Sequence, residues 1–166
     1  FLFGQYGYGH THIVQIGKDQ KKAKNLTRLL QNENILKLFH FGRFDIAILY
    51  STFGHLTSPV YCTKIASKIA RTYTDRHGLK NLLTELLEID ISKQQQSSDW
   101  GAKTLTKAQI EYAATDVLHL HALREKLNEI LERENRTNLA SECFKFLPFR
   151  AALDIKGWNE VDIFEH

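Results

Sequence analysis

Alternating apolar and polar positions mark two short strands in the first third of the chain. Residues 12–16, His-Ile-Val-Gln-Ile, predict one strand, and residues 36–41, Leu-Lys-Leu-Phe-His-Phe, predict the next. Each is followed by residues with the apolar period of a helix, at 23–31 and at 44–53, and Gly54 marks the end of the second helix. Strand, helix, strand, helix predicts an α/β fold with a partly parallel sheet covered by helices.

The second half of the chain is predicted to be almost entirely helical. The apolar periodicity predicts four further helices, at about 62–72, 78–87, 107–135 and 138–146. An aromatic-rich segment, 144–164, follows and is too short to form a domain of its own. We expect it to fold back over the rest of the protein or to contact a second subunit, because exposed aromatic side chains near a terminus are usually buried somewhere.

Length and composition indicate a single globular domain spanning residues 1–166. The chain is 43% hydrophobic and 25% charged, which is enough to bury a substantial core. No apolar run approaches the ~20 residues of a membrane span, and no signal peptide pattern is present. We therefore expect a cytoplasmic protein that does not insert into membranes. Cys62 and Cys143 lack metal-ligand spacing and are expected to be reduced thiols.

The segment Gln109-Ile-Glu-Tyr-Ala-Ala-Thr-Asp116 carries the most informative chemistry. Tyr112 and Asp116 lie four residues apart on a predicted helix, so their side chains share one face. A carboxylate can bind a divalent metal ion, and a tyrosine hydroxyl beside it can orient a water molecule for phosphodiester hydrolysis. Such pairs also occur by chance on helices, so the pair alone leaves a purely structural role open.

Several ordered motifs together resemble a known enzyme family. Phe39-His-Phe-Gly-Arg-Phe-Asp45 is similar to the second motif of the ribonuclease D branch of the DEDD 3′-5′ exonucleases, and Tyr112 with Asp116 is similar to the tyrosine form of the third motif. The connecting segments match in order at 78–82, 92–100 and 105–113. The resemblance covers the chain from about residue 12 onward and is closest to the small single-domain bacterial members.

The resemblance implies a ribonuclease H-like exonuclease fold with a mixed sheet flanked by helices. It implies Asp45, Tyr112 and Asp116 as catalytic residues, with Asp45 and Asp116 as ligands of Mg²⁺ or Mn²⁺ in a two-metal site. The expected activity is removal of nucleotides from the 3′ ends of single-stranded RNA or DNA, with RNA as the expected substrate. From the residues alone, an aspartate near a helix start favours a capping role for Asp45 over a catalytic one, and the resemblance reverses that order.

The chain departs from the family at the first motif. The family carries Asp-x-Glu on its opening strand, whereas the only acids before Asp45 are Asp19 and Glu33, and neither has an acidic partner two residues away. The chain also begins at Phe1 and contains no methionine. We therefore expect a fold truncated at its N-terminus and impaired activity. The unpaired strand edges would lead to marginal stability, to pairing with a second copy in a homodimer, or to a rearranged N-terminal segment in which residues 1–3 and 6–8 fill the gap.

Contacts to nucleic acid are predicted at basic, amide and aromatic side chains. A stripe at helical spacing would neutralise phosphates, or would simply form a solvated helix face. The polar loop before the third motif would line the substrate groove, or would merely connect two helices, with its tryptophan stacking on bases or packing inward. The candidate residues are His40, Arg43, Lys64, Lys68, Arg71, Lys93, Gln96 and Trp100. His40 also fits a packed imidazole, and Arg43 also fits a partner for a carboxylate.

Two functions without catalysis remain open. With a net charge of +3, the domain is compatible with binding nucleic acid without cleaving it. A protein that associates with itself through an exposed sheet edge and the aromatic segment is the third alternative.

Overall fold

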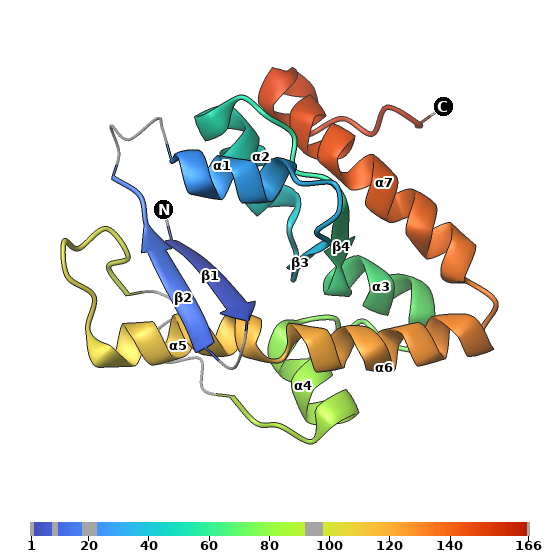
Figure 1. Ribbon diagram of the computed structural model, residues 1–166. Coiled ribbons are helices and arrows are strands. Elements are labelled where there is room, and N and C mark those ends of the chain that lie inside the picture. The colour runs from blue at the N-terminus through green and yellow to red at the C-terminus, as the bar shows by residue number, and fades with distance from the viewer. Residues whose placement is uncertain (1, 8–9, 18–22, 92–97, 166) are drawn as a thin grey trace.

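The computed structural model describes residues 2–7, 10–17, 23–91 and 98–165 (Figure 1). An N-terminal hairpin comes first, followed by alternating helices and strands and then by helices alone. The strands are β1 (Leu2–Gly7), β2 (His10–Gln15), β3 (Lys37–Phe39) and β4 (Val60–Cys62). The helices are α1 (Lys24–Gln31), α2 (Arg43–Phe53), α3 (Thr63–Ala70), α4 (Leu79–Leu87), α5 (Lys107–Leu118), α6 (Leu120–Arg133) and α7 (Thr137–Leu153), followed by the π-helical turn η1 (Asp154–Trp158).

The α/β class is confirmed, but the strands of the described residues form two separate pairs rather than one continuous mixed sheet. β1 pairs with β2 antiparallel over the full length of both strands, with Leu2 opposite Gln15 and Gly7 opposite His10. β3 pairs with β4 in parallel over three residues each. α2 connects β3 to β4, as parallel neighbours require a crossover.

Helices cover these strands in two packed groups. One buried cluster joins α1, α2, β3, β4 and α7 and includes Leu30, Ile46, Leu49 and Leu147. The second joins α3, α4, α6 and α7 and includes Leu82, Leu123, Leu127 and Leu131. Figure 1 shows α7 running along one side of the molecule and α5 with α6 along another, with β3 and β4 between them.

The single helix expected at 107–135 is in fact two helices. His119, with φ −101° and ψ 1°, ends α5 and precedes α6. The two helices pack on different partners, α5 on the β1–β2 hairpin and α6 on α3 and α4. Because the two helices pack against different elements, the helix axis changes direction slightly between α5 and α6 (Figure 1).

The C-terminal aromatic segment begins as helix and ends as an exposed extension. α7 continues to Leu153, beyond the expected end at 146, with Pro148 buried inside it. Phe164 contacts Phe146, with ring centroids 5.7 Å apart, yet Phe164 remains 66% exposed and Trp158 45% exposed. Phe164 therefore packs against the helical part of the same segment, and the segment buries less aromatic surface than expected.

None of the helices in the described part of the chain is both long and apolar enough to cross a membrane. Cys62 is buried, Cys143 is half-buried, and the two are not bonded to each other.

Candidate functional site

Asp45 lies in the first turn of α2, directly after a tight turn that follows β3. Gly42 occupies the N-cap position and has no side chain to cap the helix. Burial raises the pKa of the Asp45 carboxyl above its usual range and outweighs the lowering effect of its own backbone amide. Asp45 is therefore an acid of the first helical turn rather than the N-cap residue, and its carboxylate is partly withdrawn from water.

Tyr112 and Asp116 are presented by α5, whose start is held by a capping box. The Thr106 side chain accepts from the Gln109 amide, and the Gln109 side chain accepts from the Thr106 amide. The Gln109 side chain also donates to the Asp99 carbonyl oxygen at 2.9 Å, which ties the preceding loop to the helix. One helical turn further along, Tyr112 and Asp116 share a face as the spacing predicts.

The Asp45 charge acts on Asp116, and the Asp116 charge acts on Tyr112. Burial, followed by the nearby charge of Asp45, raises the pKa of Asp116 to about 6. Burial, followed by the charge of Asp116, raises the pKa of Tyr112. The start of α2 and the end of α5 thus bring two carboxyl groups and a phenol into one electrostatically coupled cluster. Asp116 is largely ionised at neutral pH, and the Tyr112 hydroxyl keeps its proton.

Trp100 packs against Tyr112. The two ring centroids are 5.9 Å apart and the ring planes are tilted by 43°. Trp100 is only partly exposed. Its ring packs against the Tyr112 ring and so restricts where the phenol can lie. The other two predicted residues of this loop, Lys93 and Gln96, lie outside the described residues.

His40 is a packed, neutral imidazole. The Thr63 hydroxyl donates to the Phe39 carbonyl oxygen at 3.2 Å, so the His40 Nδ1–H group donates to Thr63 Oγ1 at 2.9 Å. Burial, together with the nearby Lys64 ammonium, lowers the pKa of His40 to about 4. As a neutral ring at pH 7, His40 cannot provide the positive charge that a phosphate contact would use.

Arg43 forms an ion pair within the protein. Its Nε and one terminal nitrogen each donate to Asp154 at 2.7 Å, and the same terminal nitrogen donates to the Asn159 carbonyl oxygen at 3.0 Å. This two-point pairing ties the start of α2 to the η1 turn. The carboxylate alternative for Arg43 is therefore correct, and the predicted phosphate contact is not supported.

The predicted basic stripe of Lys64, Lys68 and Arg71 is only partly present at the surface. α3 ends at Ala70, and the Arg71 side chain turns inward, with 0% of its surface exposed. It donates to the Ser67 hydroxyl and to the Arg76 carbonyl oxygen, each at 3.0 Å, and pairs with Glu85. The prediction that Arg71 contacts nucleic acid is thus wrong, because its hydrogen-bonding groups are used inside the fold.

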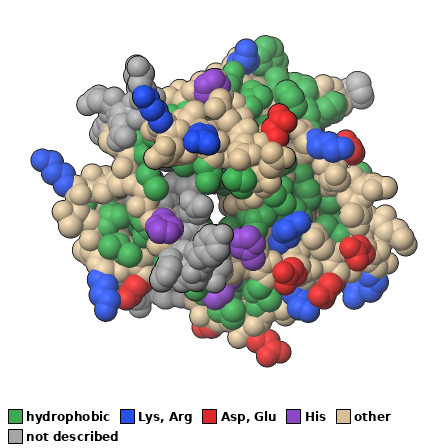
Figure 2. Space-filling model, viewed as in Figure 1, with side chains coloured by type: hydrophobic (Ala, Val, Ile, Leu, Met, Phe, Trp, Pro, Cys, Tyr) green, Lys and Arg blue, Asp and Glu red, His purple; other side chains and the backbone are tan. Residues whose placement is uncertain are grey.

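The two lysines of the stripe differ from Arg71 in exposure. Lys68 is exposed, and Lys64 is half-buried, with its ammonium nitrogen 3.5 Å from the centroid of the Phe41 ring. Lys and Arg side chains on the face drawn in Figure 2 are scattered rather than gathered into one band. A broad basic surface is therefore not a feature of that face, and Lys64 is the lysine of the stripe that lies beside the turn preceding Asp45.

Sequence reasoning did not single out Phe41 and Phe44 as candidates, although both flank the turn that leads to Asp45. Both rings are exposed, and Phe41 has a positive φ of 60°. The signal in the sequence was a bulky aromatic residue directly before a glycine at a strand-to-helix turn, where a small residue is more usual.

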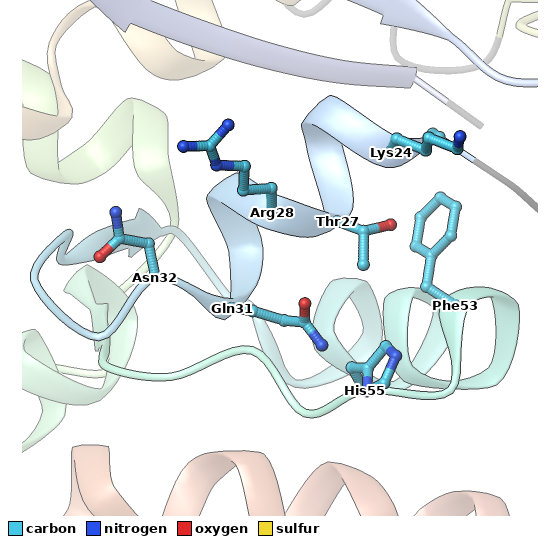
Figure 3. Close-up of a pocket in the computed structure, with 8 residues that line it drawn as sticks. Lys24, Thr27, Arg28, Gln31, Asn32, Phe53 and His55 are labelled. Atoms are coloured by element: carbon cyan, nitrogen blue, oxygen red, sulfur yellow. The ribbon is translucent and has the colours of Figure 1, made fainter.

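A pocket elsewhere in the fold does not include the carboxylate cluster. Figure 3 shows Lys24, Thr27 and Arg28 entering from α1, and Phe53 and His55 from the end of α2 and the segment after it. None of Asp45, Tyr112 and Asp116 lines it. The candidate site is therefore defined by the coupled acids and not by this pocket.

The donor chemistry of the cluster suits a hard divalent cation. Carboxylate oxygens are the ligands that Mg²⁺ and Mn²⁺ prefer, and a cation would relieve the repulsion that Asp45 exerts on Asp116. Within residues 11–17, 23–91 and 98–165, however, no group of three or more His, Cys, Asp and Glu side chains is placed to hold a metal ion. The two aspartates thus fit part of a metal site.

Comparison with known proteins defines the class of enzyme. A family model described as 3′-5′ exonuclease matches residues 4–132. Ribonuclease D of Gluconacetobacter diazotrophicus is 41% identical over 108 residues, which cover 65% of this chain and 27% of that protein. Ribonuclease D of Granulibacter bethesdensis is 38% identical over 114 residues, covering 69% of this chain and 29% of that protein. The chain thus spans less than a third of the length of these curated relatives.

Solved structures agree with this class. Brucella melitensis NrnC bound to pGG is 55% identical, covers 99% of this chain and 80% of that chain, and superposes with a TM-score of 0.95. The same protein with bound Mg²⁺ is 56% identical, covers 96% of this chain and 78% of that chain, and has a TM-score of 0.91. Escherichia coli RNase D is 23% identical with a TM-score of 0.81 over 96% of this chain and 43% of that chain, which shows the shared fold.

The fold is that of an α/β nuclease. The chain belongs to the 3′-5′ exonuclease family, in the ribonuclease D and NrnC group of the DEDD superfamily.

Proposed function

We propose that this protein removes nucleotides from the 3′ end of single-stranded RNA with the aid of a divalent metal ion. The feature that carries the proposal is the placement of two partly buried acids from different helices, such that burial and then the Asp45 charge raise the pKa of Asp116. Structures of the 55–56% identical NrnC with bound Mg²⁺ and with bound pGG support both the metal and the nucleic-acid ligand.

We assign Asp45 and Asp116 to hold Mg²⁺ or Mn²⁺. When bound, such a cation supplies a water nucleophile at neutral pH and stabilises the negative charge that develops on the phosphodiester. Asp116 must be ionised to serve as a ligand, and with a pKa of about 6 it is largely ionised at neutral pH. Asp45 provides the second carboxylate from the first turn of α2.

We assign Tyr112 to orient the attacking water. The phenol keeps its proton because its pKa is raised, so the hydroxyl can both donate and accept a hydrogen bond. Trp100 packs on the ring, and Asp116 lies one helical turn away. These neighbours limit the freedom of the Tyr112 side chain, which is what positioning a water molecule requires.

The two aspartates alone would bind Mg²⁺ weakly, since that ion gives up its waters reluctantly and two-metal sites use several carboxylates. We therefore propose low activity for the 166-residue chain by itself. Binding of single-stranded nucleic acid without cleavage is the second candidate, favoured by the observation that fewer than three ligands gather in the described residues.

The experiment uses single-stranded RNA labelled at its 5′ end, incubated with the 166-residue chain and Mn²⁺ or Mg²⁺. Stepwise shortening that retains the 5′ label, requires the metal and disappears in Asp116→Asn and Asp45→Asn supports the exonuclease. Glu111→Gln is the matched control, because Glu111 lies on the same helix with its side chain exposed. Binding without shortening supports the second candidate, and shortening that persists in Asp116→Asn contradicts the assigned roles. A parallel DNA strand measures the preference for RNA.

A further inference from the structure

The turn that joins β3 to α2 holds a phenylalanine in a strained and exposed position. Phe41 has a φ of +60°, a left-handed conformation that is uncommon for a bulky side chain, and 46% of its surface is exposed. An Asn or Gly would adopt this backbone with less strain. The fold therefore bears a backbone cost without burying the ring, which is typical of residues with a functional contact.

The residues on both sides of Phe41 fix this turn. A Cβ atom on Gly42 would lie 2.5 Å from the Phe39 Cβ, so only glycine fits there without displacement. On the other side, His40 donates to Thr63, and Thr63 in turn donates to the Phe39 carbonyl oxygen. With both flanks packed and hydrogen-bonded, the Phe41 ring is presented at the surface as a preorganised group.

A second aromatic ring and a cation complete this surface. Phe44 is 58% exposed and lies edge-on to Phe41, with ring centroids 5.4 Å apart. The Lys64 ammonium is placed over the Phe41 ring at 3.5 Å from its centroid. Phe44 immediately precedes Asp45 in the chain, so the turn that carries the two rings also leads into the first candidate carboxylate.

We propose that Phe41 and Phe44 form a stacking surface for a nucleobase of the substrate strand, with Lys64 beside it to neutralise an adjoining phosphate. The inference rests on the proposed function, since the base must belong to a strand whose end reaches Asp45 and Asp116. Aromatic rings bind bases of any sequence because every base has a π-face, and the Lys64 ammonium over one face of the Phe41 ring suits the phosphate backbone that accompanies the base.

A second copy of the chain is a poorer occupant of this surface. Together with Ile48, which is also exposed on α2, the two rings expose roughly 300 Å², taking about 150–250 Å² for each large side chain. A stable interface buries about 800 Å² on each partner. The surface is thus large enough for one or two bases and too small for a dimer contact by itself.

The test measures binding of a short single-stranded RNA that carries one 2-aminopurine near its 3′ end, in EDTA so that no cleavage occurs. We expect the fluorescence of 2-aminopurine to be quenched on binding to the wild-type chain. Phe41→Asn and Phe44→Ala should each weaken binding about tenfold and relieve the quenching. Phe149→Ala is the matched control, because Phe149 is also 58% exposed but lies on α7, and it should bind like the wild type.

Two further measurements separate stacking from a structural role. An RNA that lacks the base at the labelled position should bind the wild type and both variants equally. Phe41→Asn should be at least as stable to heat as the wild type, because Asn tolerates the left-handed backbone. A loss of stability in Phe41→Asn, together with unchanged binding in Phe44→Ala, would overturn the proposal.

The outcomes also distinguish this inference from the proposed function. If the wild type shortens RNA but both variants bind and quench as it does, the stacking surface is refuted and the exonuclease stands. If the wild type neither binds nor shortens RNA, both fail together. If Phe44→Ala instead dissociates an oligomer in sedimentation, without an effect on RNA binding, the surface is a contact between copies and the proposal is wrong.

Discussion

Replacing Asp116 with asparagine should stabilise the protein at neutral pH while removing the proposed activity. In the folded chain, burial and the Asp45 charge raise the pKa of Asp116 from its ordinary 3.8 to about 6. The ionised carboxylate is therefore less favourable in the folded state than in the unfolded state. Asparagine has nearly the same shape and no charge, so it removes both the cost of burying a charge and the repulsion by Asp45.

The size of the effect follows from the pKa. Each pKa unit is worth about 1.4 kcal/mol, which makes the difference between 3.8 and 6 about 3 kcal/mol. We reduce this to about 1.5 kcal/mol because the carboxyl group is partly exposed and solvent screens it. For a domain of this size, 1.5 kcal/mol raises the melting temperature by roughly 3–6 °C.

The dependence on pH provides the sharper test. Because the folded state holds the Asp116 proton more tightly than the unfolded state, the wild type gains stability relative to Asp116→Asn as the pH falls through about 6 toward 4. Below about pH 4 the carboxyl is protonated in both states, and the advantage of the variant disappears. Removing the Asp45 charge with Asp45→Asn should lower the pKa of Asp116 toward its ordinary value.

The assay is urea unfolding of the wild type and Asp116→Asn, followed by circular dichroism at pH 7.5, 6.5, 5.5 and 4.5. The side-chain carboxyl signal of Asp116 in NMR measures its pKa directly, with and without Asp45→Asn. Glu111→Gln on the same helix should change stability by less than about 0.5 kcal/mol at every pH. Equal stability of Asp116→Asn and wild type at pH 7.5, or a difference that does not change with pH, would refute the raised pKa of Asp116, and an Asp116 pKa unchanged by Asp45→Asn would refute the coupling of the two acids.

Four other substitutions probe the turns and contacts of the fold, each measured by urea unfolding. Arg71→Met should lower the free energy of unfolding by roughly 2–3 kcal/mol, because it leaves buried hydrogen-bonding partners unsatisfied. Lys68→Ala should leave the free energy of unfolding unchanged and at most weaken RNA binding at low salt. Equal losses of stability in the two variants would contradict the buried position of Arg71. Gly42→Ala should lower the free energy of unfolding by about 2 kcal/mol, because the added Cβ would collide with Phe39. An unchanged urea midpoint would show that the turn can adjust to the extra atom. Thr106→Ala should cost about 1 kcal/mol by removing the cap of α5, and no loss would mean that tertiary packing alone holds the helix start.

Local interactions explain what could be read from the sequence by itself. Helix α2 ends at Gly54, which has a φ of 75°, because only glycine enters this left-handed conformation without strain. Tyr112 and Asp116 share a face because helix geometry determines it from spacing alone. The ordered motifs from Phe39 onward identified the exonuclease family, and the family model covering residues 4–132 confirms it.

Burial and long-range packing decided the rest. The periodicity placed Arg71 on a basic stripe, but the helix ends one residue earlier and Ser67 and Glu85 bind the guanidinium inside the fold. The break at His119 follows from two packing surfaces that no local pattern encodes. The division of the strands into two pairs likewise depends on which segments meet in three dimensions.

The site divides in the same way. The residue types Asp45, Tyr112 and Asp116, and their local placement on two helices, were determined by the sequence. Whether the two carboxyl groups act on one another depends on the packing of α2 and α5 within the whole domain, and only the tertiary structure decided it. Helix geometry extends over a few residues, whereas the electrostatic repulsion between Asp45 and Asp116 exists only once distant parts of the chain are brought together and partly withdrawn from water.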